Sequence, residues 1–350
     1  MLFIFISTLS SCIKEVKLNY RTPQPTLVVE GLLLTDGTPC KVTLSYSGLF
    51  IPAGAQVPDY INDATVFVKD NDEADSVQLV NQDNGVYLAE DFFKVKVGNS
   101  YSISITLSNG EKYTSVPEKV LPVSNDFQLD TIGVSVPYGL PDLYGADIQI
   151  RTKDPAGEKN YYRWIAIDYL PREAKGVPCG SPGGAPVSCF KFCYQFYNEK
   201  DIRILSDATI DGNEIRHQTV LVAPYYYVGL HYVEIKQLSL SRQAYQFWQL
   251  YLEQSARTGS ILDPLPSPIQ GNIYNVADPD KLALGYFEVS DVASKKYILF
   301  PTFINAYYTL AYAFRYIDPR IGPCWEIYPD AIHFAPSGWE NLPETRYDVY

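Results

Sequence analysis

Apolar and polar residues alternate with a period of two along the first third of the chain. The clearest run, Tyr101–Leu107, is followed by the turn Ser108–Gly110 and a second alternating run. Successive side chains of a strand point to opposite faces, so this pattern predicts half-buried strands joined by a hairpin. Similar runs occupy residues 26–32, 40–45, 64–69 and 86–88. About seven strands at this spacing predict an immunoglobulin-like β-sandwich over residues 25–125.

Residues 126–350 continue the strand pattern and contain one predicted helix. Ala244, Phe247, Trp248 and Tyr251 recur at i, i+3, i+4 and i+7, which predicts an amphipathic helix over about 241–257. We therefore expect an all-β chain whose second, larger domain is a β-sandwich or barrel-like unit carrying this helix. The further strands predicted for this domain cover residues 147–151, 161–169, 219–222, 232–237, 283–290, 296–301 and 307–316.

The apolar run at the N-terminus ends in Leu9-Ser10-Ser11-Cys12, the pattern of a bacterial lipoprotein signal. We expect residues 1–11 to be an incomplete signal peptide, because only Met1 precedes the apolar run and a basic segment is missing. Cys12 would carry the lipid, and residues 12–24 would form a tether. Each buried methylene contributes roughly 0.8 kcal/mol, so a multiply acylated cysteine is a stable membrane anchor. The alternative is a short hydrophobic strand that happens to end in cysteine.

Composition narrows the class of partner. The 350 residues carry a net charge of −12 with no basic cluster, which argues against a nucleic-acid partner. The chain has 29 tyrosines and one methionine. Because tyrosine favours half-buried pleated surfaces, this bias supports an all-β protein.

The five cysteines beyond Cys12 suggest disulfides. An exported protein meets an oxidising compartment, so we expect one or two bonds among Cys179, Cys189, Cys193 and Cys324, and the sequence leaves their pairing open. Cys40 alternates with apolar residues and is predicted to be a buried thiol. A zinc site is the alternative, but only Cys189 and Cys193 approach the ligand spacing that such a site requires.

Catalytic motifs are not recognisable. The chain has no Gly-x-Ser-x-Gly elbow, and its three histidines fit no nucleophile or zinc pattern. The acidic run 70–75 resembles the start of a calcium loop but lacks the turn glycine, so a solvated hairpin tip is favoured. We therefore expect no metal and no cofactor.

Two tyrosine clusters are the remaining candidates for a binding surface. They comprise Tyr225, Tyr226 and Tyr227 in one run and Tyr307 and Tyr308 in another. Adjacent strand residues face opposite sides, so each run must direct a ring away from the core unless another layer covers it. The two interpretations are an aromatic contact surface and an ordinary mixture of core and surface.

Four groups of segments, in order along the chain, carry a resemblance. They are 25–31; 62–68 with 85–87; 154–155 with 160–164; and 238–248 with 266–275 and 284–287. Together they resemble the Bacteroidota lipoprotein family catalogued as domain of unknown function 4249. The resemblance implies an accessory lipoprotein of TonB-dependent outer-membrane receptors, and it supplies no catalytic residues.

These observations favour a non-enzymatic lipoprotein, anchored in the outer membrane on the cell-surface side. It would help a TonB-dependent (SusC-like) transporter to capture or gate a nutrient such as a glycan, a peptide or a metal chelate. One alternative is a cell-surface adhesin or envelope structural protein. Another is a carbohydrate-active hydrolase, which would require two carboxylates about 5–9.5 Å apart in a cleft.

Overall fold

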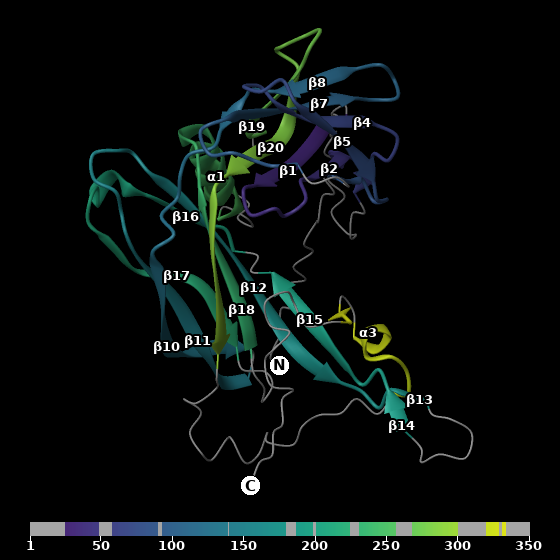
Figure 1. Ribbon diagram of the computed structural model, residues 1–350, viewed down its shortest axis with the longest axis vertical. Helices are drawn as coiled ribbons and strands as arrows, with labels where there is room; N and C mark the ends of the chain where they lie inside the picture. Colours follow the sequence, from purple (N-terminus) through teal and green to yellow (C-terminus); the bar gives the residue numbers. More distant parts are fainter. Residues whose placement is uncertain are drawn as a thin grey trace, which may run out of the picture.

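The computed structural model describes residues 25–48, 58–89, 93–138, 140–179, 187–198, 201–224, 231–256, 268–299, 320–328 and 331–333. Nine strands close into a barrel at one end of the molecule (Figure 1). They follow one another around the barrel in this order: β1 (Leu27–Leu34), β20 (Leu282–Ser290), β19 (Gln270–Asn275), β8 (Lys112–Ser115), β7 (Ser100–Thr106), β4 (Thr65–Asp70), β5 (Ser76–Asn81), β6 (Val86–Ala89) and β2 (Lys41–Tyr46). Pairing of β1 with β2 closes the ring. Two short strands, β3 (Asp59–Tyr60) and β9 (Glu118–Lys119), extend β2 and β7.

The alternating sequence fills the barrel interior. The inward rows of β4 and β7, including Val66, Val68, Ile103 and Ile105, are fully buried. Together with the inward residues of the other strands they form one apolar core. The period-two pattern therefore identified the buried faces correctly.

The all-β class is confirmed, but the first unit is a closed barrel and not an immunoglobulin-like sandwich. The difference comes from β19 and β20, which lie far along the chain and insert between β1 and β8. Strand β20 pairs in parallel with β1, in register from Val28 beside Leu284. The barrel therefore draws strands from both sides of the predicted boundary at residue 125.

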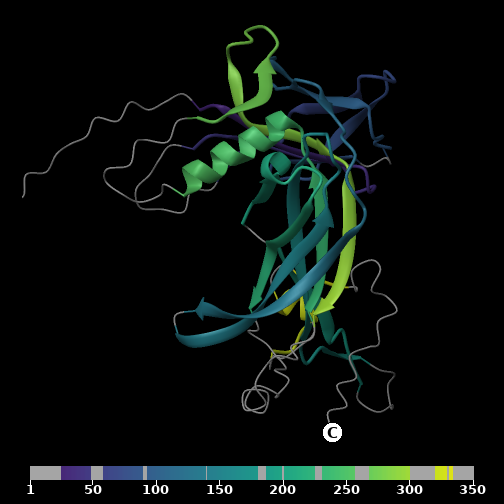
Figure 2. The same ribbon diagram turned by 90° about the vertical axis from the view of Figure 1, so that its left-hand side faces the viewer.

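Within the described residues, the second part of the molecule has three further sheets, and two of them share its main core. One contains β21 (Val292–Leu299), β18 (His231–Ser239), β12 (Tyr161–Glu173), β15 (Phe192–Asn198) and β22 (Ala331–Ile332), with β16 (Arg203–Ser206) on the edge of β12. The other contains β10 (Phe127–Tyr138), β11 (Leu140–Lys153) and β17 (Glu214–Pro224). Buried side chains of both sheets, such as Ile148, Trp164 and Ile235, share one core. Figure 2 shows these long strands running away from the barrel.

At the β20–β21 junction, a single residue separates the barrel from the second part. Asp291 lies between β20 and β21, and its two carboxylate oxygens accept hydrogen bonds from Thr35 Oγ1 (2.6 Å) and from the Val123 backbone N–H (2.9 Å). The carboxylate therefore links the end of β1, the segment before β10 and the β20–β21 junction.

Helix α1 (Arg242–Ser255) occupies the range that the sequence predicted. Ser241 is its N-cap and accepts a hydrogen bond from the Ala244 N–H at 3.1 Å. Ala244 and Phe247 are buried, whereas Tyr251 is 44% exposed, so the apolar face is covered at its start and open at its end. Among the described residues, no helix combines the length and the apolar character needed to cross a membrane.

Candidate functional site

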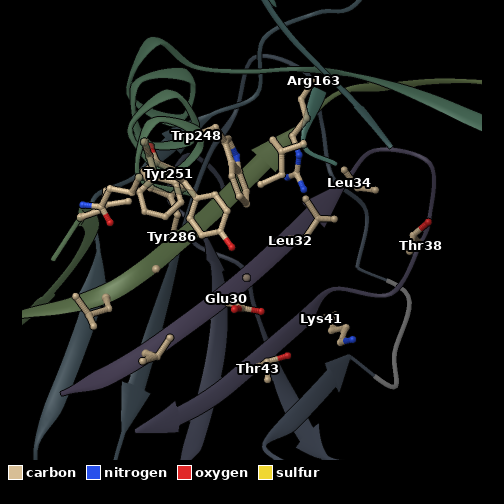
Figure 3. A pocket seen from close by; sticks show the side chains of 18 of the residues that line it. Glu30, Leu32, Leu34, Thr38, Lys41, Thr43, Arg163, Trp248, Tyr251 and Tyr286 are labelled. Atoms are coloured by element: carbon tan, nitrogen blue, oxygen red, sulfur yellow. The ribbon is translucent and has the colours of Figure 1, made fainter. Parts of the chain in front are cut away.

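A cavity of about 650 Å³ lies between α1 and the outer face of the barrel; we call it the α1 groove (Figure 3). Strand β1 forms its floor, with β20 and β2 on either side. Helix α1 and Arg163 of β12 contribute the walls. The volume falls within the range of small-molecule sites, roughly 300–1,000 Å³.

The floor of the groove is the outward row of β1, namely Val28, Glu30, Leu32 and Leu34. The inward row of the same strand belongs to the barrel core. Strand β1 is therefore apolar on both faces, with Glu30 as the exception. An outward row of aliphatic residues would be costly in open water, and here it faces a sheltered cavity.

Close backbone approach beneath the groove depends on glycine. Gly285 has a φ of +87°, and a Cβ there would lie 2.1 Å from the Val29 carbonyl oxygen. A Cβ at Gly271 would lie 1.7 Å from the Gly285 carbonyl oxygen. Glycine is therefore required at both positions, because no side chain fits between the strands.

The Asn272 side chain satisfies backbone groups that the irregular pairing of β19 with β20 leaves without ladder partners. Its side-chain oxygen accepts the Phe287 N–H and its Nδ2 donates to the Phe287 carbonyl oxygen, both at 2.9 Å. Asn272 thus replaces missing ladder bonds within the sheet, whereas Asn275 caps a turn through the N–H groups of Ala277 and Asp278.

An ion pair and a tryptophan fix the wall of the groove. Glu288 is 2% exposed, and its Oε2 accepts hydrogen bonds from Arg163 Nη1 at 2.7 Å and from Trp248 Nε1 at 2.6 Å. The Arg163 guanidinium lies 4.1 Å from the centre of the Trp248 ring, in a cation–π arrangement. Trp248, which the helical spacing placed on the apolar face of α1, lines the groove and is held at one edge by Glu288.

A second buried carboxylate lies behind this wall. Glu118 accepts hydrogen bonds from the Tyr286 hydroxyl and from Asn272 Nδ2. Burial raises the pKa of Glu118, because the charged form loses water and lies near Glu288. Burial and the neighbouring Glu118 raise the pKa of Tyr286 as well, so its hydroxyl remains a donor. These bonds hold the Tyr286 ring against Phe247 of α1, with centroids 5.0 Å apart.

The predicted lipidation site, Cys12, lies outside the described residues. So do the tyrosines of the predicted aromatic surface: Tyr225, Tyr226, Tyr227, Tyr307 and Tyr308. None of the five cysteines downstream of Cys12 is among the residues that line the α1 groove.

The structure brings the four candidate disulfide cysteines together at one end of the second part. Cys179 bonds Cys189, joining β13 (Val177–Cys179) to β14 (Val187–Cys189), and their Cα atoms lie 5.8 Å apart. Cys193 of β15 bonds Cys324 in helix α3 (Cys324–Ile327), with Cα atoms 5.6 Å apart. Cys40 is a buried free thiol, and burial raises its pKa to about 12.

The acidic run 70–75 forms the tip of the β4–β5 hairpin. The Asp70 carboxylate accepts the backbone N–H groups of Asp72 and Glu73, which closes the turn. This arrangement matches the solvated hairpin tip favoured from the sequence.

Two further clusters of ionisable side chains lie in the second part of the molecule. Within the described ranges, one set of three acids could surround a cation: Asp154, Asp207 and Asp211. Each already accepts a hydrogen bond, from partners that include the Tyr162 hydroxyl and the Gly212 N–H. In addition, His231 Nδ1 lies 2.7 Å from Asp168 Oδ2 in the buried interior. The sequence did not indicate either group, because each joins residues more than 45 positions apart.

The α1 groove was not predicted from the sequence, although one apolar run indicates a strand that is covered on both faces. The run Leu27–Leu34 reads Leu-Val-Val-Glu-Gly-Leu-Leu-Leu, which is apolar on both faces. Continuous apolar character marks a strand that is covered on two sides. In a barrel strand, one of those sides must be supplied by another element or by a ligand.

Comparison with known sequences identifies a family for this chain. Residues 13–296 match the family described as Domain of unknown function (DUF4249), so the match spans most of the chain and includes every strand of the barrel. No curated protein matches the sequence.

Proposed function

We propose that this chain, which belongs to the DUF4249 family, is a non-enzymatic lipoprotein of the outer membrane that captures a nutrient for a TonB-dependent transporter. The observation that carries the proposal is the α1 groove. It is a preformed, mainly apolar cavity with a few fixed polar groups, as is typical of ligand sites. The buried carboxylate of Glu288 behind its wall is engaged by Arg163 and Trp248, which suits a positioning role better than proton transfer.

The position of the groove in the chain supports tethered capture. Pro25 follows Cys12 by 13 positions, which an extended chain spans in at most about 45 Å. Pro25, which lies next to the start of β1 and of the groove, would therefore be held within this distance of the lipidated cysteine. Such a tether raises the local concentration of the binding site at the transporter without any new contact.

The partner in this proposal comes from the resemblance to lipoproteins that accompany TonB-dependent receptors. The test is co-purification of the tagged protein from detergent-solubilised outer membranes. We expect a TonB-dependent receptor to be recovered with it. Recovery of the lipoprotein alone would remove the partnership, and a deletion strain that keeps uptake but loses attachment would favour the adhesin.

The anchor is tested by Cys12→Ser. The barrel core and the main core of the second part both lie downstream of residue 25. We therefore expect a folded protein that is released into the soluble fraction. Ser11→Ala is the matched control, because it keeps a small residue before the cysteine and should leave the protein membrane-bound. If Cys12→Ser stays on the membrane after salt and carbonate washes, the lipid anchor is wrong.

A further inference from the structure

The α1 groove changes in character along its length. At the start of β1 its lining is aliphatic, with Val28, Leu284 and Ile269. At the end of β1, Leu32 and Leu34 lie between two cationic side chains, Arg163 on one side and Lys41 on the other (Figure 3). A ligand that fills the groove therefore meets an apolar end and a cationic end.

Two charges in the groove have no recorded partner within the described part of the chain. Lys41 and Glu30 are both exposed, and neither makes an ion pair or a side-chain hydrogen bond with another described residue. Arg163 uses Nη1 for Glu288, which leaves other guanidinium donors for a ligand. The groove thus offers cationic donors at one end and one carboxylate near its middle.

The spacing of these charges follows from strand register. Lys41 pairs with Leu32, and Glu30 lies two residues before Leu32 on β1. Two residues cover about 7 Å along a strand, and neighbouring strands lie about 5 Å apart. The backbone positions of Glu30 and Lys41 are therefore about 8–9 Å apart, which is the length of two to three extended residues.

Resting on the proposed function, we infer that the captured nutrient is a short apolar peptide with a free C-terminal carboxylate. The carboxylate binds Lys41 and the remaining donors of Arg163. A backbone N–H donates to Glu30, and the apolar side chains lie against the aliphatic end and Tyr251. This occupant pairs each exposed charge and covers the apolar floor at the same time.

The other nutrient classes fit this lining less well. A glycan presents hydroxyl groups along its whole length, and the aliphatic end of the groove would leave them without partners, which costs about 1–3 kcal/mol for each buried group. A multiply anionic metal chelate would place negative charge against Glu30. An apolar peptide carries its negative charge at the C-terminus alone, which can lie at the cationic end of the groove.

The experiment is calorimetric titration of the full-length protein in detergent with three probes: trileucine, trileucine amide and maltohexaose. We expect trileucine to bind at least tenfold more tightly than its amide, and maltohexaose not to bind. Equal affinity for the acid and the amide, binding of maltohexaose alone, or no binding of trileucine would each overturn the ligand class.

Lys41→Met sharpens this test, with Lys69→Met as the matched control. Both lysines are exposed strand residues of the barrel, but Lys69 lies on β4, away from the groove. We expect Lys41→Met to weaken trileucine binding about tenfold while leaving the amide unchanged, and Lys69→Met to change neither. Equal effects of the two variants would overturn the assignment of Lys41.

The ligand and the transporter partnership can fail separately. If the receptor co-purifies but trileucine does not bind, the peptide class is wrong and the proposed function stands. If trileucine binds as expected but no receptor co-purifies, the transporter role is wrong and the peptide site stands.

Discussion

The region around the α1 groove and the disulfide-linked end are built by different means. Around the groove, Trp248 of α1 and Arg163 of β12 donate buried hydrogen bonds to Glu288 of β20. Tyr286 of β20 donates another to Glu118 of β9. The disulfide-linked end, which comprises β13, β14, α3 and the adjoining ends of β12 and β15, lies away from the barrel (Figure 1) and carries both disulfides. One region relies on buried polar groups and the other on covalent bonds.

The size of the local core explains this difference. The groove adjoins the large barrel core, so its buried charges sit in a well-packed frame that keeps their partners in place. At the disulfide-linked end, the described apolar cluster has four buried members, Ala174, Cys193, Cys324 and Ile327. So small a core supplies little hydrophobic stabilisation, and cross-links compensate by limiting the unfolded chain.

The largest expected effect is that of Glu288→Ala. The change leaves the Arg163 guanidinium and the Trp248 N–H without their acceptor in a buried site. Breaking a buried pair by removing one partner costs about 3–5 kcal/mol. We expect a loss of this size in the free energy of unfolding, measured by urea denaturation, together with weaker ligand binding because Trp248 loses its orientation.

Glu73→Ala is the control for this effect. Glu73 pairs with Lys96 on the barrel surface, where both side chains are more than 40% exposed. Exposed pairs contribute about 0–1 kcal/mol, so this variant should unfold almost as the wild type does. Similar losses for Glu73→Ala and Glu288→Ala would show that burial does not distinguish the two ion pairs.

A smaller and more local effect is expected when Cys193 and Cys324 are both replaced by alanine. This bond joins residues 131 positions apart, and removing a native disulfide typically costs about 2–5 kcal/mol. Because the barrel and the α1 groove have their own cores, we expect the cost to fall on β15 and α3. Hydrogen exchange should accelerate in Phe192–Asn198 and remain slow in β7.

Two outcomes would contradict this interpretation. Exchange that accelerates equally in β7 would show that the disulfide-linked end and the barrel unfold as one unit. Unchanged exchange in β15 would show that its small core is sufficient without the cross-link. The Cys179–Cys189 bond spans only 10 positions, so its removal should have a smaller effect on β15.

The sequence predicted the local features of both regions. Period-two alternation identified the inward row of β7, and the spacing of Ala244, Phe247 and Trp248 identified α1. These features depend on neighbouring residues alone. The cysteine spacing located the disulfide-linked end without its pairing, because pairing depends on where β15 and α3 meet.

The closed barrel and the groove could not be derived in this way. Alternation shows which side chains share a face of a strand but not which strand lies beside it. The parallel pairing of β1 with β20 joins residues more than 250 positions apart, and it creates both the barrel closure and the groove floor. Trp248 illustrates the consequence, since its helical face was predicted but the cavity beside it depends on the distant strand β1.

The smallest expected effect concerns protonation of Glu118. Burial raises its pKa above the ordinary value of 4.5, so the folded protein binds this proton more tightly than the unfolded chain does. The contribution of Glu118 to the free energy of unfolding therefore falls as the pH rises from about 4.5 through the raised pKa. Above that pKa it changes no further. Glu118→Gln cannot ionise and can still bond Tyr286 and Asn272. We expect its stability relative to wild type to increase across this pH range.

Glu111→Gln should show the opposite sign. The hydrogen bond from Lys281 lowers the pKa of Glu111, so the wild-type carboxylate stabilises the fold above the ordinary pKa of 4.5 and loses this contribution as the pH falls through its lowered pKa. The glutamine variant should therefore lose stability relative to wild type as the pH rises from the lowered pKa to about 4.5. Urea denaturation of both variants between pH 3 and pH 8 measures the two trends. Parallel trends in the two variants would show that buried Glu118 titrates like partly exposed Glu111. The contrast between the buried polar groups around the α1 groove and the ion pairs of the barrel surface would then be lost.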